Sequence, residues 1–174
     1  MSSLASIVHR AMPIYAWAPK GYREMMAMPR NARLSMKDVQ PALFKVEDFD
    51  WGDVYDINEK INRTAKYHKD DPGTDTWGPW RLIDGVRVGD CEDFAVHKLQ
   101  FMMANGYDRG ALRLAICLTE HKELHCVLLM YLSDGDAIIL DNRNKGLWRK
   151  SKYLKYTWLS EEWPGHGFWW RKLT

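Results

Sequence analysis

The stretch VGDCEDFA, residues 88–95, decides the fold, because it is typical of a helix start that carries a reactive cysteine. Gly89 frees the backbone, Asp90 suits the N-cap, and Asp93 stands three residues later, where its carboxylate completes the first turn. Apolar residues follow at helical spacing, and Asn105-Gly106 supplies a stop. The pattern predicts that Cys91 lies in the first turn of a helix whose remainder is buried.

A cysteine in that position is suited to covalent catalysis. The unpaired backbone N–H groups and the positive end of the helix dipole favour thiolate over thiol. The same N–H groups can donate to an oxyanion that forms beside the sulfur. Cys91 is therefore the candidate nucleophile, although a first-turn cysteine also occurs simply as a small structural residue.

The residues after this helix predict antiparallel strands at 112–118, 125–132 and 137–140. A helix followed by antiparallel strands indicates an α+β fold, with the cysteine helix packed on the sheet. His125 begins the second of these strands, and Asp141 follows the third.

The turn between the last two strands decides whether His125 and Asp141 meet. A three-residue loop over 133–135, with Gly135 in the left-handed conformation, pairs Leu132 with Asp136. Asp141 then lies diagonally beside His125 on the same face. A two-residue loop would put them on opposite faces. The longer loop predicts a Cys-His-Asp triad in which His125 is the general base and Asp141 orients it.

The length and composition of the chain limit its domain count, its partners and its expected location. The 174 residues suit a single globular domain, in which 1–48 is a lead-in of uncertain structure and 49–174 is the catalytic domain. A net charge of +2 favours no nucleic-acid partner, and no apolar run is long enough to insert in a membrane. The three cysteines form no disulfide pattern, and no signal peptide is evident, so a cytoplasmic location is expected.

The motif at 89–95, with Lys98 after it, resembles the signature of the bacterial transglutaminase-like cysteine proteinases, in particular their LapG-like branch. The resemblance extends over roughly residues 51–145. It rests upstream on residues 54–58, Asn62, Tyr67, Asp70, Gly73, Trp77 and Pro79, and downstream on residues 112–114, 125–129 and 140–142.

The resemblance implies a papain-like or transglutaminase-like fold in which Cys91, His125 and Asp141 are catalytic. It also implies a calcium ion bound by Asp90, Glu92 and Asp93. Carboxylates beside a thiolate would raise its pKa, and a bound cation would offset that effect.

Other features concern substrate and partners. Trp77 and Trp80 are candidates to wall a groove for a protein or peptide substrate, although tryptophans in such loops also serve the core. The chain is short and without an export signal, which is compatible with a phage- or prophage-type, virion-associated member. The tryptophan-rich stretch 153–170 would then supply a partner contact, or would pack on the sheet.

Three functions fit these residues. A cysteine peptidase would hydrolyse a peptide or amide bond through an acyl-enzyme. A transglutaminase-type enzyme would resolve the same thioester with an amine. A virion or binding module would keep the fold without turnover.

Overall fold

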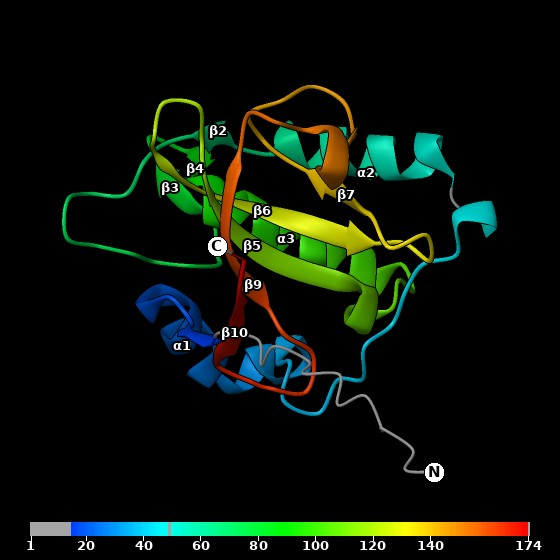
Figure 1. The fold of residues 1–174 in the computed structure, drawn as a ribbon. Helices are drawn as coiled ribbons and strands as arrows, with labels where there is room; N and C mark the ends of the chain where they lie inside the picture. Colours follow the sequence, from blue (N-terminus) through cyan, green and yellow to red (C-terminus); the bar gives the residue numbers. More distant parts are fainter. Residues whose placement is uncertain (1–14, 49, 174) are drawn as a thin grey trace, which may run out of the picture.

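The computed structural model describes residues 15–48 and 50–173, and its centre is a seven-stranded antiparallel sheet (Figure 1). The strands run across the sheet in the order β1 (Tyr15–Trp17), β10 (Trp169–Lys172), β9 (Thr157–Glu162), β5 (Leu112–Leu118), β6 (Leu124–Tyr131), β7 (Ala137–Leu140) and β8 (Trp148–Arg149). A small second sheet has the order β2 (Lys66–Tyr67), β4 (Val86–Gly89) and β3 (Arg81–Ile83). The α+β expectation is confirmed.

Helices cover one face of the large sheet and share its main core. They are α1 (Lys20–Ala27), α2 (Trp51–Asn62) and α3 (Cys91–Ala104), with the short 3-10 helices η1 (Pro29–Leu34), η2 (Val46–Asp48) and η3 (Arg109–Ala111). The 3-10 helix η4 (Lys150–Lys152) lies by the opposite face, where Lys150 contacts Tyr131 and Trp158. Figure 1 shows α3 lying across strands β5 and β6. Leu99 and Met102 of α3 pack there against Leu128 of β6, and all three are fully buried.

The start of α3 is as predicted. Cys91 is its first residue, Asp90 is the N-cap, and the reciprocal capping box between Asp90 and Asp93 is present. The helix ends at Ala104 with Asn105 as the C-cap, so the predicted stop is also confirmed. The side chain of Cys91 is thereby fixed at the rim of the core, where the helix meets the sheet.

The hairpin between β6 and β7 has the three-residue loop. Leu132 N donates to Asp136 O at 2.9 Å, and Gly135 has φ of +86°. The paired residues, Tyr131 with Ala137 through Leu128 with Leu140, continue the same register. If this register is continued by one more pair, Asp141 lies opposite the residue two positions after His125. This is the placement that the longer loop predicted.

The apolar residues over 51–67 recur at helical spacing and predict a helix of that length, but α2 is shorter. Its N-cap Asp50 accepts from Gly52 N and Asp53 N, and its last helical residue is Asn62. Lys66 and Tyr67 instead pair in parallel with Val88 and Gly89 of β4. That pairing ends the helix early and sets Tyr67 beside the residue that lies two positions before Cys91.

Residues 15–48 belong to the same core as the rest. Strand β1 pairs with β10 from the other end of the chain. Tyr22 and Met25 of α1 are 1% exposed, and the Tyr22 hydroxyl donates to Glu162 Oε1 at 2.6 Å. The stretch 153–170 contributes β9 and the start of β10, and its residues Tyr153, Tyr156 and Trp158 pack on the sheet. None of the described helices is long and apolar enough to cross a membrane.

Candidate active site

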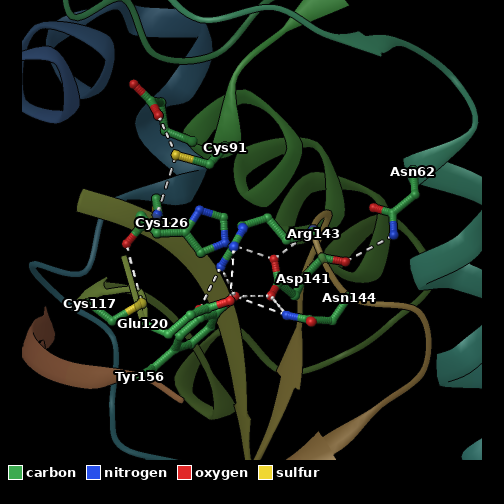
Figure 2. Close-up of polar contacts among 11 residues, drawn as sticks. Asn62, Cys91, Cys117, Glu120, Cys126, Asp141, Arg143, Asn144 and Tyr156 are labelled. Atoms are coloured by element: carbon green, nitrogen blue, oxygen red, sulfur yellow. Dashed lines mark hydrogen bonds and ion pairs between the residues drawn. The ribbon is translucent and has the colours of Figure 1, made fainter. Parts of the chain in front are cut away.

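The start of α3 and the start of β6 meet at one cavity. Cys91 and His125 both line this cavity of about 410 Å³. The backbone N–H of Cys126, the residue after His125, donates to Sγ of Cys91 at 3.4 Å (Figure 2). The sulfur and the imidazole that the sequence assigned to one site therefore share it.

His125 and Asp141 form the second half of the site. Nε2 of His125 lies 2.8 Å from Oδ1 of Asp141, and both side chains are buried. Because Nε2 is engaged by the carboxylate, Nδ1 is the ring nitrogen left to exchange a proton with the sulfur. Sequence reasoning brought together the three residues that the structure brings together.

Besides His125, other groups also hold the carboxylate of Asp141 (Figure 2). Its Oδ2 accepts from the Tyr156 hydroxyl and from Asn144 Nδ2, each at 2.6 Å, and its Oδ1 accepts from Arg143 N at 3.0 Å. Burial alone would raise the pKa of Asp141. The bond and charge of His125, helped by Tyr156 and the Arg143 amide, instead hold that pKa well below its usual range. Asp141 therefore stays ionised beneath the imidazole.

Sequence reasoning did not find Tyr156 or Asn144. Asn144 follows Asp141 by three residues in a turn, where a polar side chain commonly bonds back to an aspartate, so a local signal existed. Tyr156 arrives from the segment before β9, and its ring packs edge-on against His125 with centroids 5.6 Å apart. No local pattern marks a residue of that kind.

The sulfur of Cys91 also donates to its neighbour Glu92, with 3.0 Å between Sγ and Oε2. Burial and the nearby Glu92 carboxylate raise the pKa of the Cys91 thiol well above its ordinary value. The helix N-terminus was expected to favour the thiolate. Burial and the acidic neighbours act against that effect.

Three carboxylates converge beside the sulfur. One oxygen each from Asp70, Asp90 and Glu92 lies within 4.8 Å of the others. Burial, followed by the charge of Asp90, raises the pKa of Glu92 to about 8, and burial also raises the pKa of Asp90. Oδ1 of Asp90 is buried with no hydrogen-bond partner among the described residues. An oxygen-rich, electron-rich cluster of this kind fits a hard divalent cation such as calcium.

The sequence named Asp93 in this cluster, and the structure places Asp70 there instead. The Asp93 carboxylate accepts from Gly78 N at 2.9 Å and from Asp90 N at 3.4 Å, so the capping box and the loop before β3 occupy it. Asp70 comes from the loop after β2, which the pairing of β2 with β4 carries to the start of α3.

The structure places the two tryptophans that were candidates for the groove wall in different surroundings. Trp77 lines the cavity but is 4% exposed, and its Nε1 donates to Asp75 Oδ1 at 2.7 Å. Trp80 stacks on His97 with centroids 3.9 Å apart and is not among the residues lining the cavity. Trp77 is thus a core residue that borders the cavity. The rings of Trp77 and Trp80 do not form one wall of a substrate groove.

A cysteine at a helix start, facing a histidine–aspartate pair on a sheet, is the arrangement of a transglutaminase-like cysteine proteinase. The family model described as bacterial transglutaminase-like cysteine proteinase, BTLCP, matches residues 15–174, and the chain belongs to that family. No curated protein sequence matches the chain.

Solved structures of Legionella pneumophila LapG share the fold. One aligns with a TM-score of 0.52 at 24% identity, covering 63% of this chain and 62% of that one. A calcium-bound form aligns with a TM-score of 0.51, also at 24% identity and with coverage of 63% and 62%. An EGTA-treated form aligns at 0.52 and 24% identity, covering 63% of this chain and 61% of that one. The chain thus spans less than two thirds of each of these proteins.

Proposed function

We propose that this chain is a cysteine peptidase that cleaves a peptide or amide bond through an acyl-enzyme with a Cys91-His125-Asp141 triad. The observation that carries the proposal is the shared cavity, in which Sγ of Cys91 contacts the amide next to His125 while His125 contacts Asp141. Cys91 attacks the carbonyl carbon, and His125 takes the thiol proton and passes it to the leaving amine. Asp141 fixes the imidazole with Nδ1 toward the sulfur.

The tetrahedral oxyanion needs donors that are already in place. Cys91 is the first residue of α3, so its backbone N–H has no partner within the helix. We propose that this N–H donates to the oxyanion, with the helix dipole adding to the stabilisation.

We also propose that Asp70, Asp90 and Glu92 bind calcium in the active protein. Bound calcium supplies positive charge beside the sulfur and offsets the carboxylates. Its binding requires Glu92 to give up the proton that burial favours, and Glu92 would turn its oxygens from the thiol to the cation. The calcium-bound form of LapG supports this proposal at the level of the fold.

The deciding experiment is labelling with a peptide carrying a vinyl sulfone, a thiol-directed electrophile, with and without a chelator. Mass spectrometry should place the label on Cys91, and Cys91→Ala should remove it while the circular dichroism spectrum stays unchanged. His125→Ala should slow labelling strongly. Labelling of Cys91 at the rate of a free thiol, with no dependence on His125, would support a non-catalytic binding module instead.

Transglutaminase-type acyl transfer is the second candidate, because it would use the same thioester. One observation favours keeping it open: His125 also lines a further cavity, from which an amine could reach the acyl group. Incorporation of a labelled amine into a glutamine-bearing protein, lost in Cys91→Ala, would identify transfer.

A further inference from the structure

A second cavity, of about 320 Å³, adjoins the candidate active site and is also lined by His125. The two cavities share Tyr67, Leu124 and His125, and Cys91 lines only the first. Tyr67 is 59% exposed and Leu124 is 70% exposed, so both project at the rim between the cavities. His125 therefore lines both a cavity that contains the sulfur and a cavity that does not.

The chemistry of the reaction assigns one part of the substrate to each cavity. The acyl carbon must bond to Sγ of Cys91, so the acyl part of a substrate occupies the first cavity. The leaving nitrogen must receive its proton from the imidazole, so the amine part lies beside His125, the residue that also lines the second cavity. Resting on the proposed function, we infer that the second cavity binds the amine side of the scissile bond and prefers a cationic residue there.

The lining of the second cavity carries the preference for a cation. Besides the shared residues it contains Thr119, Glu123, Asn142 and Arg143. Glu123 forms no ion pair with any described residue. The Arg143 guanidinium is already engaged, because its Nη1 and Nη2 each lie 3.2 Å from a carboxylate oxygen of Glu120. The uncompensated charge in this cavity is therefore negative.

A second observation also points to a ligand. Oδ1 of Asn142 is buried and has no hydrogen-bond partner among the described residues. A buried amide oxygen without a donor is costly, so a donor is expected to arrive from outside. A peptide N–H or an ammonium group in this cavity would supply one. Glu123 and Asn142 together thus match a donor-rich cation and reject an anion.

The same cavity would admit any amine that resolves the acyl-enzyme. In that step the amine nitrogen attacks the thioester carbonyl and the C–S bond breaks. The sulfur takes the electron pair, and His125 carries the amine proton to it. Water can follow the same route, which makes partition between water and an added amine a direct measure of binding in the second cavity.

The test uses p-nitrophenyl acetate to acetylate Cys91 of the whole chain, with Cys91→Ala as the blank. Lysinamide and norleucinamide then compete with water, and mass spectrometry measures the acetylated amine against acetate. These amines share an α-amine and differ in side-chain charge, so lysinamide should be favoured by about fivefold, the upper range for a solvent-exposed ion pair. Glu123→Gln should bring the two close to equal. Asp71→Asn, which removes an acid that lines only the first cavity, should leave the ratio unchanged.

The outcomes separate the two proposals. If Cys91 forms an acetyl-enzyme but partitions equally to lysinamide and norleucinamide, or keeps its preference in Glu123→Gln, the assignment of the second cavity is wrong and the peptidase proposal stands. If no acetyl-enzyme forms above the Cys91→Ala blank, the peptidase proposal is overturned, and the second cavity loses its role with it.

Discussion

Sγ of Cys91 donates a hydrogen bond to Oε2 of Glu92, its neighbour in the chain, across 3.0 Å. The candidate nucleophile is therefore held in its protonated form by an acid that also belongs to the three-carboxylate cluster. A cation in that cluster would compete with the thiol for the Glu92 oxygens. Thiol reactivity and cation binding are thus coupled through one side chain.

The first prediction concerns the alkylation of Cys91 by iodoacetamide in cation-free protein. Only the thiolate reacts, and burial together with Glu92 raises the pKa of Cys91, so the thiolate fraction at pH 7 is smaller than in a free cysteine. The rate should still be rising at pH 9. Calcium should move the profile to lower pH, with about a tenfold gain in rate at neutral pH for each unit of pKa.

Glu92→Gln should abolish most of the acceleration by calcium, since it removes a proposed ligand. Digestion and mass spectrometry separate labelling of Cys91 from that of the buried Cys117 and Cys126. A cation-free profile centred at or below the value for free cysteine would contradict the prediction.

The second prediction concerns the pH dependence of calcium binding. The pKa of Glu92 is raised to about 8, so at pH 7 calcium must displace a proton from Glu92. Affinity measured by calorimetry should fall as pH decreases from 9 to 6, by up to about tenfold per unit for one displaced proton. Proton release should appear as a heat that depends on the ionisation enthalpy of the buffer.

Asp70→Asn should weaken calcium binding, because Asp70 offers an oxygen to the cluster. Asp71→Asn is the matched control: it changes the next acid along the chain, which also lines the cavity but is outside the cluster. Equal affinities for the two variants would remove Asp70 from the site.

Local sequence rules were enough to predict the parts of the site that depend on near neighbours. The capping residues Asp90 and Asp93 predicted where α3 begins. The sequence left two registers open for the hairpin, and the structure has the one that sets Asp141 beside His125, with Gly135 in the left-handed conformation. Both depend on backbone conformation within a few residues, which side-chain type largely determines.

The parts that were not predicted depend on contacts between distant segments. Tyr156 reaches Asp141 from the far side of η4, and Asp70 reaches Glu92 because β2 pairs with β4. The effect of burial on the Cys91 pKa was also not predicted, because burial is a property of the whole fold; the sequence indicated only the opposing effects of the helix terminus and of the neighbouring carboxylates. Strand β1 was not anticipated for the same reason, since its partner β10 lies at the other end of the sequence.

The third prediction assigns Tyr156 a positioning role. Its hydroxyl donates to Asp141 at 2.6 Å, while its ring packs against His125. Tyr156→Phe keeps the ring and removes the donor. A hydrogen bond to a charged group contributes about 1.5–3 kcal/mol, so the labelling rate by a peptidyl electrophile should fall on the order of tenfold or more.

A purely structural role for Tyr156 would lower stability without changing the pH profile. The positioning role also moves the acidic limb of the labelling profile to higher pH, because Asp141 loses one of the bonds that lower its pKa. Tyr107→Phe is the control, because Tyr107 stacks on Phe44 with centroids 5.6 Å apart and lines neither cavity beside His125. A Tyr156→Phe profile with unchanged shape would argue against positioning.

The last prediction concerns Glu161, a fully buried carboxylate that ties β9 to its neighbours. Burial would raise its pKa, but Lys150 at 3.1 Å, Tyr131 at 2.6 Å and Arg171 lower it. A folded-state pKa below the unfolded value gives stability that is present above about pH 4.3 and is lost as pH falls through the folded pKa. Glu161→Gln should therefore cost about 3–5 kcal/mol at pH 7, because it leaves the buried Arg113 and the partly exposed Lys150 and Arg171 without their carboxylate, and should flatten the fall of Tm between pH 5 and pH 2. Thermal unfolding followed by circular dichroism at several pH values measures both effects, with the exposed Glu47→Gln as the control. An acid profile as steep in Glu161→Gln as in the wild type would show that another carboxylate carries the acid sensitivity of the fold.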